Sequence, residues 1–233
     1  MCFSAGASFT AGVMLTVIGT ETLRKVHKPS QVVFASIPVF FAFQQFTEGI
    51  LWLAIGKPGF AGLETVTTYI FLIMAQIIWP IMIPLSVLLL EDNRKRKKIL
   101  FALFGVGITI GLYYTYRLIF YNIHASISGN HLAYHGTDSD PMIMVGIAFY
   151  LTATLAPLFV SSLKRTYILG VIMGISFIVS AVFYRYCLTS VWCFFAAVIS
   201  FVVLYIIRDA HAKKLRLDKL SLSKIIAPLM HKP

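Results

Sequence analysis

The chain has 233 residues, of which 58% are apolar and only 12% are charged, and its mean hydropathy is +0.83. Soluble domains are nearer to roughly 45–50% apolar and about 25% charged. This composition excludes an ordinary soluble globule, a disordered chain and a nucleic-acid-binding domain. The net charge of +11 does not indicate nucleic acid, because it lies in the segments between apolar runs. The composition indicates a polytopic membrane protein.

Seven apolar segments are long enough to cross a bilayer, which requires roughly 20 mostly apolar residues per helix. They cover about residues 3–22, 31–55, 66–90, 99–121, 142–163, 166–187 and 190–207. The first is rich in small residues, which favour close packing against other helices. A signal peptide is the alternative, but Arg24 and Lys25 follow this segment instead of preceding it. We therefore expect an all-α membrane protein, with residues 1–207 forming a single bundle of seven transmembrane helices.

The basic residues predict the direction of these spans. All but three of the 20 Lys and Arg residues follow spans 1, 3, 5 and 7, the exceptions being Lys57, Arg117 and Arg185. Because Lys and Arg concentrate in cytoplasmic loops, the N-terminus should lie outside and the C-terminus in the cytoplasm. The tail, residues 208–233, is basic and amphipathic. It forms either a short helix on the anionic inner leaflet or a solvated positive tail.

Four short motifs occur in order along the chain. They are Met1-Cys2-Phe3-Ser4, Gln44-Gln45-Phe46-Thr47-Glu48-Gly49 followed by Trp52, His131-Leu132-Ala133-Tyr134, and Ser190-Val191-Trp192-Cys193. With this set the chain resembles an uncharacterised family of bacterial integral-membrane proteins that begin Met-Cys-Phe-Ser. The resemblance implies a multi-pass protein of the bacterial plasma (inner) membrane, and it implies no activity.

Glu48 is the clearest ionisable residue inside a span, and such residues by default mark a site. It lies eight residues, or roughly 12 Å at 1.5 Å per residue, from the outer end of span 2. Gln44, Gln45 and Trp52 neighbour it at helical spacing. One interpretation is a carboxyl group in a polar cavity, acting as a ligand or a proton carrier. The other is a structural hydrogen bond between helices.

Arg117 shares one face of span 4 with Tyr113 and Tyr116. It is a natural partner for Glu48, but an arginine that snorkels to the interface beside an aromatic belt explains the pattern equally well. In span 3 the prolines that follow Gln76 predict a kink, which frees backbone carbonyls for a neighbour or a cavity. The full set of pocket candidates is Gln44, Gln45, Glu48, Trp52, Gln76, Tyr113, Arg117, Tyr134, Arg185 and Trp192.

Cysteine and histidine gather near the expected outer surface. Cys2, Cys187 and Cys193 fall at the outer ends of spans, where an oxidising compartment permits one disulfide. His131 and His135 are four residues apart, which would place both on one face if the segment were helical. Candidate zinc or copper ligands are therefore Cys2, Glu48, His131, His135 and Cys193. Packing cysteines and unpartnered loop histidines are the alternative.

The polar candidates lie almost entirely in the outer half of the spans. A channel or an alternating-access transporter needs polar lining in both halves, so these classes are disfavoured. Two functions remain open. The first is an outward-facing pocket that binds or senses a metal, a lipid head group or a small solute. The second is an outward-facing membrane enzyme, a metal- or thiol-dependent hydrolase or transferase acting on a lipid or lipoprotein. The bilayer and an outer-face ligand are the expected partners, and nucleic acid is not.

Overall fold

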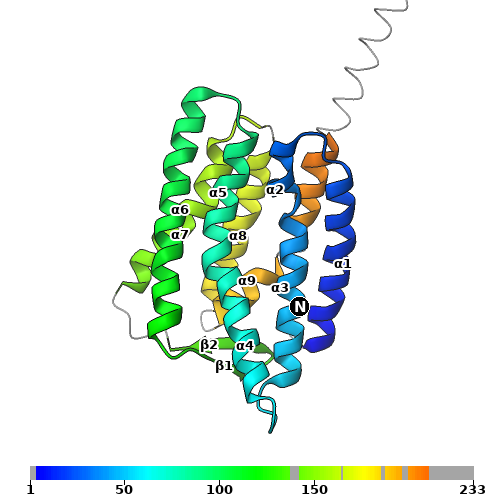
Figure 1. Cartoon of the computed structure of the whole chain (residues 1–233), viewed down its shortest axis with the longest axis vertical. Helices are drawn as coiled ribbons and strands as arrows, with labels where there is room; N and C mark the ends of the chain where they lie inside the picture. The colour runs from blue at the N-terminus through cyan, green and yellow to red at the C-terminus, as the bar shows by residue number, and fades with distance from the viewer. Residues whose placement is uncertain (1–3, 137–141, 164, 185–186, 196–198, 210–233) are drawn as a thin grey trace, which may run out of the picture.

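The structure is a computed structural model that describes residues 4–136, 142–163, 165–184, 187–195 and 199–209, except the side chains of residues 193 and 194. Within these ranges it is an elongated helical bundle with a small β-hairpin at one end (Figure 1). A helical segment at 199–209 follows the labelled elements. Those elements are α1 (Ala5–Arg24), η1 (Pro29–Gln31), α2 (Val32–Ala35), α3 (Ile37–Ala54), α4 (Ala61–Leu72), η2 (Ile73–Ile78), α5 (Trp79–Leu90), α6 (Arg94–Phe120), β1 (His124–Ser128), β2 (His131–His135), α7 (Ile143–Val160), α8 (Thr166–Phe183) and α9 (Leu188–Phe194).

Four helical segments among the described residues are long and apolar enough to cross a membrane. They are Ala61–Leu90, Arg94–Phe120, Ile143–Val160 and Thr166–Phe183. These segments overlap the expected spans 3 to 6, so a multi-pass membrane protein is the class that the helices indicate. The α1–α2, α5–α6 and α7–α8 connections lie at the end of the bundle opposite to the hairpin (Figure 1).

α1 packs along α3 through small residues. A Cβ on Gly12 would lie 2.9 Å from the ring of Phe46, and a Cβ on Gly49 would lie 2.9 Å from the ring of Phe9. Each glycine therefore receives an aromatic ring from the other helix, which is the close approach expected for small residues.

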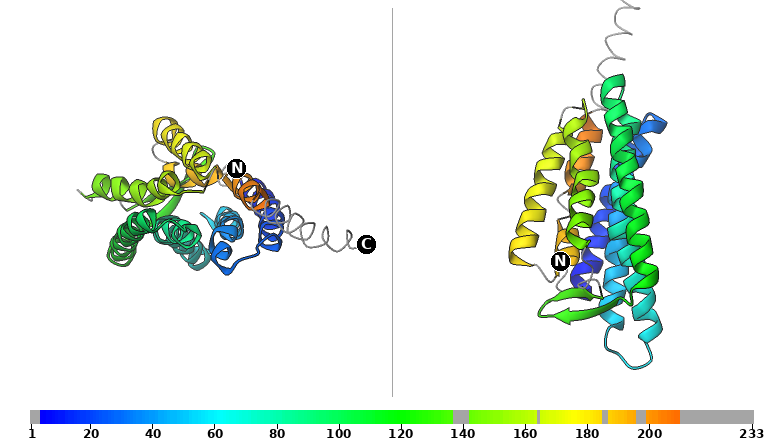
Figure 2. Two further views of the ribbon diagram at one scale, coloured as in Figure 1. Left: turned by 90° about the horizontal axis from the view of Figure 1, so that it is seen from above. Right: turned by 90° about the vertical axis from the view of Figure 1, so that its left-hand side faces the viewer.

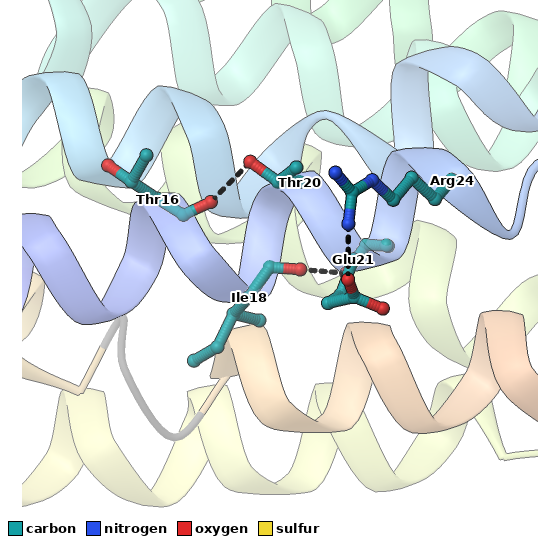
Figure 3. A network of polar contacts seen from close by, with 6 residues as sticks. Thr16, Ile18, Thr20, Glu21 and Arg24 are labelled. Carbon is teal, nitrogen blue, oxygen red and sulfur yellow. Dashed lines mark hydrogen bonds and ion pairs between the residues drawn. The ribbon is translucent and has the colours of Figure 1, made fainter.

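The threonines of α1 satisfy their hydroxyl groups within the helix. Thr20 Oγ1 donates to the carbonyl of Thr16 at 2.8 Å, one turn earlier (Figure 3). Beside it, Arg24 forms an exposed ion pair of 3.0 Å with Glu21 (Figure 3). Because hydroxyl groups bonded to a preceding carbonyl need no other partner, the polar sequence of α1 is compatible with an apolar environment.

The segment Ala61–Leu90 contains six residues of π-helix, η2, directly before Trp79 and Pro80. Pro80 has no N–H to continue the helical hydrogen bonds, so the local register changes there. α6 lies closely against this region through Gly107 and Gly111. A Cβ on Gly107 would collide with the carbonyl oxygen of Pro80.

The expectation of a purely helical protein is corrected by β1 and β2, which form an antiparallel hairpin with Ser128 opposite His131. The two-residue turn Gly129-Asn130 connects them, and Gly129 has a φ of 61°, a conformation that glycine adopts readily. A Gly-Asn pair between two short strands is a recognised hairpin signal. β1 contacts α4 and β2 contacts α9, so the hairpin lies across the end of the bundle (Figure 2).

Candidate functional site

A cavity of about 630 Å³ lies between η2, α5, α6, α7, α8 and α9, with β2 at one end. Cavities of roughly 300–1,000 Å³ with mostly apolar walls and a few polar groups are typical ligand sites. This cavity fits that description, because aliphatic, methionine and aromatic side chains form most of its wall. Its polar side chains are those of Gln76, Tyr114, Arg117, Tyr134, His135, Tyr150, Thr154 and Thr189, and the indole groups of Trp79 and Trp192 are also exposed to it.

Arg117 forms part of the cavity wall in the last turn of α6, and its residue is only 1% exposed. The centre of its guanidinium lies 5.8 Å from the ring of Tyr113, 5.9 Å from Tyr114 and 5.6 Å from Tyr121. These cation–π contacts and the negative end of the α6 dipole both favour a positive charge here. Arg117 therefore does not snorkel to the surface. Tyr116, which was expected on the same face, is 54% exposed.

The π-helix leaves the backbone carbonyl of Ala75, next to the cavity, without a backbone donor. Trp79 donates its backbone N–H to the carbonyl of Met74, and Pro80 has no N–H for the carbonyl of Ala75. The hydroxyl of Tyr150, from α7, donates to that Ala75 carbonyl at 2.6 Å. Gln76 is the next residue, and its buried Oε1 has no hydrogen-bond partner among the described residues.

Gln44 and Gln45 point to different partners although they are adjacent on α3. Gln44 Oε1 accepts a 2.8 Å hydrogen bond from Trp79 Nε1, and the Trp79 ring stacks on Phe41 with centroids 3.9 Å apart. Gln45 Nε2 donates to Glu48 at 3.4 Å. Gln44 thus supports the cavity wall from behind by positioning Trp79.

Glu48 is fully buried and connects three segments of the bundle. Ser190 Oγ on α9 donates to Glu48 Oε1 at 2.7 Å, and Ser8 Oγ on α1 lies 3.5 Å from Oε2. Glu48 does not line the cavity. Its hydrogen bonds to α1 and α9 match the structural interpretation of this carboxyl group.

Trp192 and Tyr134 close the cavity near the hairpin. Trp192 Nε1 donates to Ser176 Oγ at 3.0 Å, which ties α9 to α8. The Tyr134 ring stacks on Phe71 at 5.2 Å. Trp52 packs outside the cavity, in a small apolar cluster that includes Tyr134.

His131 and His135 lie at opposite ends of β2 and have different neighbours. Residues four apart in a strand share a face but are separated by about 13 Å along it. The His131 ring meets Tyr184 edge-on at 4.9 Å, and burial lowers the pKa of His131. The His135 ring stacks on His124 at 5.4 Å, and its Nε2 lies 2.7 Å from Ser126 Oγ. The hairpin therefore separates the two rings that a helix would have paired.

Three candidate residues fall outside what the structure describes, namely the metal-ligand candidate Cys2, the pocket candidate Arg185 and the side chain of the metal-ligand candidate Cys193. Cys187 is buried, reduced and part of the cavity wall, and burial raises the pKa of its thiol. Within the described residues, no group of three or more His, Cys, Asp or Glu side chains is arranged to hold a metal ion. The zinc or copper site stays a prediction that depends on the undescribed cysteines.

Sequence reasoning missed the cavity residues Tyr114, Tyr150 and Thr154. Tyr114 was identifiable, because it stands three residues before Arg117 and so shares its face. Tyr150 and Thr154 are four apart in an otherwise apolar span, which is a weak signal on its own.

A second polar cluster lies at the opposite end of the bundle and was also missed. Glu91, only 1% exposed, accepts hydrogen bonds from Ser162 N and Ser162 Oγ at 2.6 Å each and from Asn93 N at 2.9 Å. Arg96 donates to the Val160 carbonyl at 3.1 Å. Glu91 thus joins the α5–α6 turn to the α7–α8 turn. Glu91 follows directly after an apolar run, and a carboxyl group at the end of a span carries no signal of burial in the sequence.

The four long apolar helices indicate a multi-pass membrane protein, and the internal cavity has the size of a ligand pocket. The chain belongs to a family of unknown function, DUF6629, whose model matches residues 1–217. No curated protein and no solved structure matches the chain.

Proposed function

We propose that this chain is a binding or sensing protein of the bacterial plasma membrane, whose cavity beside β2 takes up a small solute or a lipid head group from the outer face. The observation that carries the proposal is the buried cation Arg117 in the wall of a cavity of about 630 Å³. A buried charge is costly in a membrane protein and is normally retained for a site. Ligand pockets usually combine apolar walls with a small number of polar groups that point toward the ligand. This cavity has the same composition.

The proposal includes seven spans with the N-terminus outside. Its support is that the basic connections after α1, α5 and α7 share one end of the bundle, while the hairpin lies at the other (Figure 1). A reporter fused after Pro233 should be active in the cytoplasm, and one replacing residues 131–135 should be active outside. If the two reporter activities were reversed, the end of the cavity beside β2 would face the cytoplasm.

Blocking the cavity tests whether it binds a ligand. Thr154 lines the cavity and bonds its hydroxyl to the Tyr150 carbonyl at 2.9 Å. Thr152, on the same helix, bonds its hydroxyl to the Ala148 carbonyl at 2.8 Å, but it is exposed on the outside of the bundle. Thr154→Phe should therefore fill the cavity, and Thr152→Phe is its matched control.

The measurement is mass spectrometry of small molecules released when each purified variant is unfolded. The wild type and Thr152→Phe should release a compound in near-stoichiometric amount, and Thr154→Phe should release much less. Equal amounts from all three proteins would show that nothing binds in this cavity.

A further inference from the structure

We propose that Ser126 and His135 form a nucleophile–base pair that hydrolyses a carboxylic ester, and that the acyl chain of this ester lies in the cavity. This inference rests on the cavity of the proposed function and assigns a reaction to its hairpin end.

The register of the hairpin brings a serine hydroxyl and an imidazole together. His135 is opposite His124, so Ser126, two residues further along β1, is its diagonal neighbour on the same face. Ser126 Oγ lies 2.7 Å from His135 Nε2, within the range of about 2.6–3.2 Å that joins a nucleophile to its base. The tautomer with its proton on Nδ1 allows Nε2 to accept the hydroxyl proton, as a general base must.

This face of the hairpin is turned toward α9 and the cavity. Ala133 is opposite Ser126, and it packs against Cys187 and Val191. Both His135 and Cys187 form part of the cavity wall. The Ser126 hydroxyl is therefore one hydrogen-bond length from a ring that lines the cavity.

A second serine and histidine on the same face have different contacts. Ser128 is opposite His131, but the Ser128 hydroxyl shares a hydrogen bond with the Cys187 thiol and the His131 ring meets Tyr184 edge-on. Neither of these two residues belongs to the described wall of the cavity. Cys187 itself is a poor nucleophile, because burial raises the pKa of its thiol and the thiolate is the reactive form. This second pair therefore has the contacts of packing residues.

The cavity suits the two parts of an acyl ester. Ser126 and His135 are only partly buried, so water can reach them at the hairpin end. Further in, the wall includes Met173, Phe177 and Ile199. Met173 lies ten residues before the end of α8, or roughly 15 Å from the hairpin end at 1.5 Å per residue. An acyl chain would cover this apolar wall and leave its ester group beside the hairpin.

The reaction is an acyl transfer to serine followed by hydrolysis. Ser126 Oγ attacks the carbonyl carbon of the ester while its proton moves to His135 Nε2. The C–O bond to the alcohol breaks, and the alcohol leaves with that proton, so the acyl group stays on Ser126. Water then attacks the acyl-serine in the same way, which releases a carboxylic acid and restores the hydroxyl group and the neutral imidazole. The sum is one ester and one water converted to one acid and one alcohol.

Labelling with a fluorophosphonate tests the pair, because an activated serine hydroxyl displaces fluoride and keeps the phosphonyl group. The experiment uses the full chain in detergent with a dodecyl and an ethyl fluorophosphonate, and peptide mass spectrometry locates the adduct. Both probes should label Ser126. Ser126→Ala should abolish this adduct, and Ser128→Ala, two residues along the same strand, should retain it. His135→Gln should slow the labelling about 100-fold or more, because the base is lost.

The chain length of the probe tests the acyl site. Thr154→Phe, which fills the cavity, should slow labelling by the dodecyl probe about tenfold or more relative to the ethyl probe, because several methylene groups lose their apolar contacts. Thr152→Phe, on the outside of the same helix, should leave the ratio unchanged. Turnover is measured as release of 4-nitrophenol from 4-nitrophenyl dodecanoate, which prior labelling should stop.

No adduct, or an adduct on another residue, would overturn the assignment of the nucleophile. This result needs no substitution, so it holds even if a variant does not fold. Labelling of Ser126 without release of 4-nitrophenol would overturn the hydrolysis. An unchanged ratio of the two probes in Thr154→Phe would overturn the placement of the acyl chain. Failure of the proposed function shows separately, as equal release of compounds on unfolding from the wild type, Thr154→Phe and Thr152→Phe.

Discussion

The hydroxyl of Ser190 donates a 2.7 Å hydrogen bond to Oε1 of Glu48, although the two residues are 142 positions apart in the chain. Both residues are fully buried. Because Ser8 of α1 also lies within 3.5 Å of this carboxyl group, Glu48 connects α1, α3 and α9 at one point. A polar contact that joins three helices in an apolar interior specifies which helices are neighbours.

Ser190→Ala should lower the free energy of unfolding by about 1–3 kcal/mol, because the buried carboxyl group loses the 2.7 Å hydrogen bond from the Ser190 hydroxyl. Ser200→Ala is the matched control. Ser200 is equally buried, but its Oγ has no hydrogen-bond partner among the described residues. Thermal unfolding in detergent checks both variants. Equal stability losses would mean that the Ser190–Glu48 bond contributes nothing of its own.

Tyr150→Phe should lower the free energy of unfolding by about 1 kcal/mol, because it removes the hydrogen bond from the Tyr150 hydroxyl to the Ala75 carbonyl, for which Pro80 has no backbone N–H. In a Pro80→Ala background the new N–H can serve that carbonyl, so the same change should cost clearly less. A double-mutant cycle on the unfolding free energy measures this coupling. Tyr116→Phe, at an exposed hydroxyl, is the control. An unchanged cost in both backgrounds would contradict this explanation.

Gly107→Ala should destabilise the protein by about 1–3 kcal/mol, because the new Cβ collides with the backbone of Pro80 and forces α5 and α6 apart. Gly105→Ala is matched in helix and residue type, but its Cβ meets nothing within 4 Å. It should be neutral or stabilising by up to about 1 kcal/mol through helix propensity. Denaturation midpoints of the two variants give the comparison. Loss of stability in Gly105→Ala alone would refute the packing argument.

Glu91 should make stability depend on pH at the end of the bundle opposite to the hairpin. Burial disfavours its charged form, but hydrogen bonds from Ser162 and Asn93 and the charge of Arg96 outweigh this and hold the pKa of Glu91 below its ordinary value. A lowered folded-state pKa stabilises the protein at pH values above the unfolded-state pKa of about 4.3. That stabilisation is lost as the pH falls through the folded-state pKa.

Glu91→Gln should therefore lower the melting temperature near neutral pH and reduce the further loss on acidification. The measurement is the melting temperature across a pH series. Glu21→Gln, which breaks the exposed ion pair with Arg24, should change little, because such pairs contribute little to stability. A pH profile of Glu91→Gln that parallels the wild type would exclude Glu91 as the titrating group.

The sequence alone was sufficient for the helical apolar segments and for an irregular backbone near Pro80, where it predicted a kink and the structure has the π-helix η2. These follow from local properties, since the length of an apolar run and the position of a proline act within one helix. The hairpin was not predicted, because its short strands show little alternation of apolar and polar residues, although Gly129-Asn130 is a hairpin signal.

Only the tertiary structure decided which polar residues meet. Helical spacing places Gln44, Gln45 and Glu48 near one face, yet Gln44 bonds to Trp79 on α5 while Gln45 bonds to Glu48. Likewise, β2 separates His131 from His135 although four residues suggested a pair. Periodicity shows which side chains share a face, whereas the partner across that face depends on which helices pack together, and that is set by contacts between residues far apart in the chain.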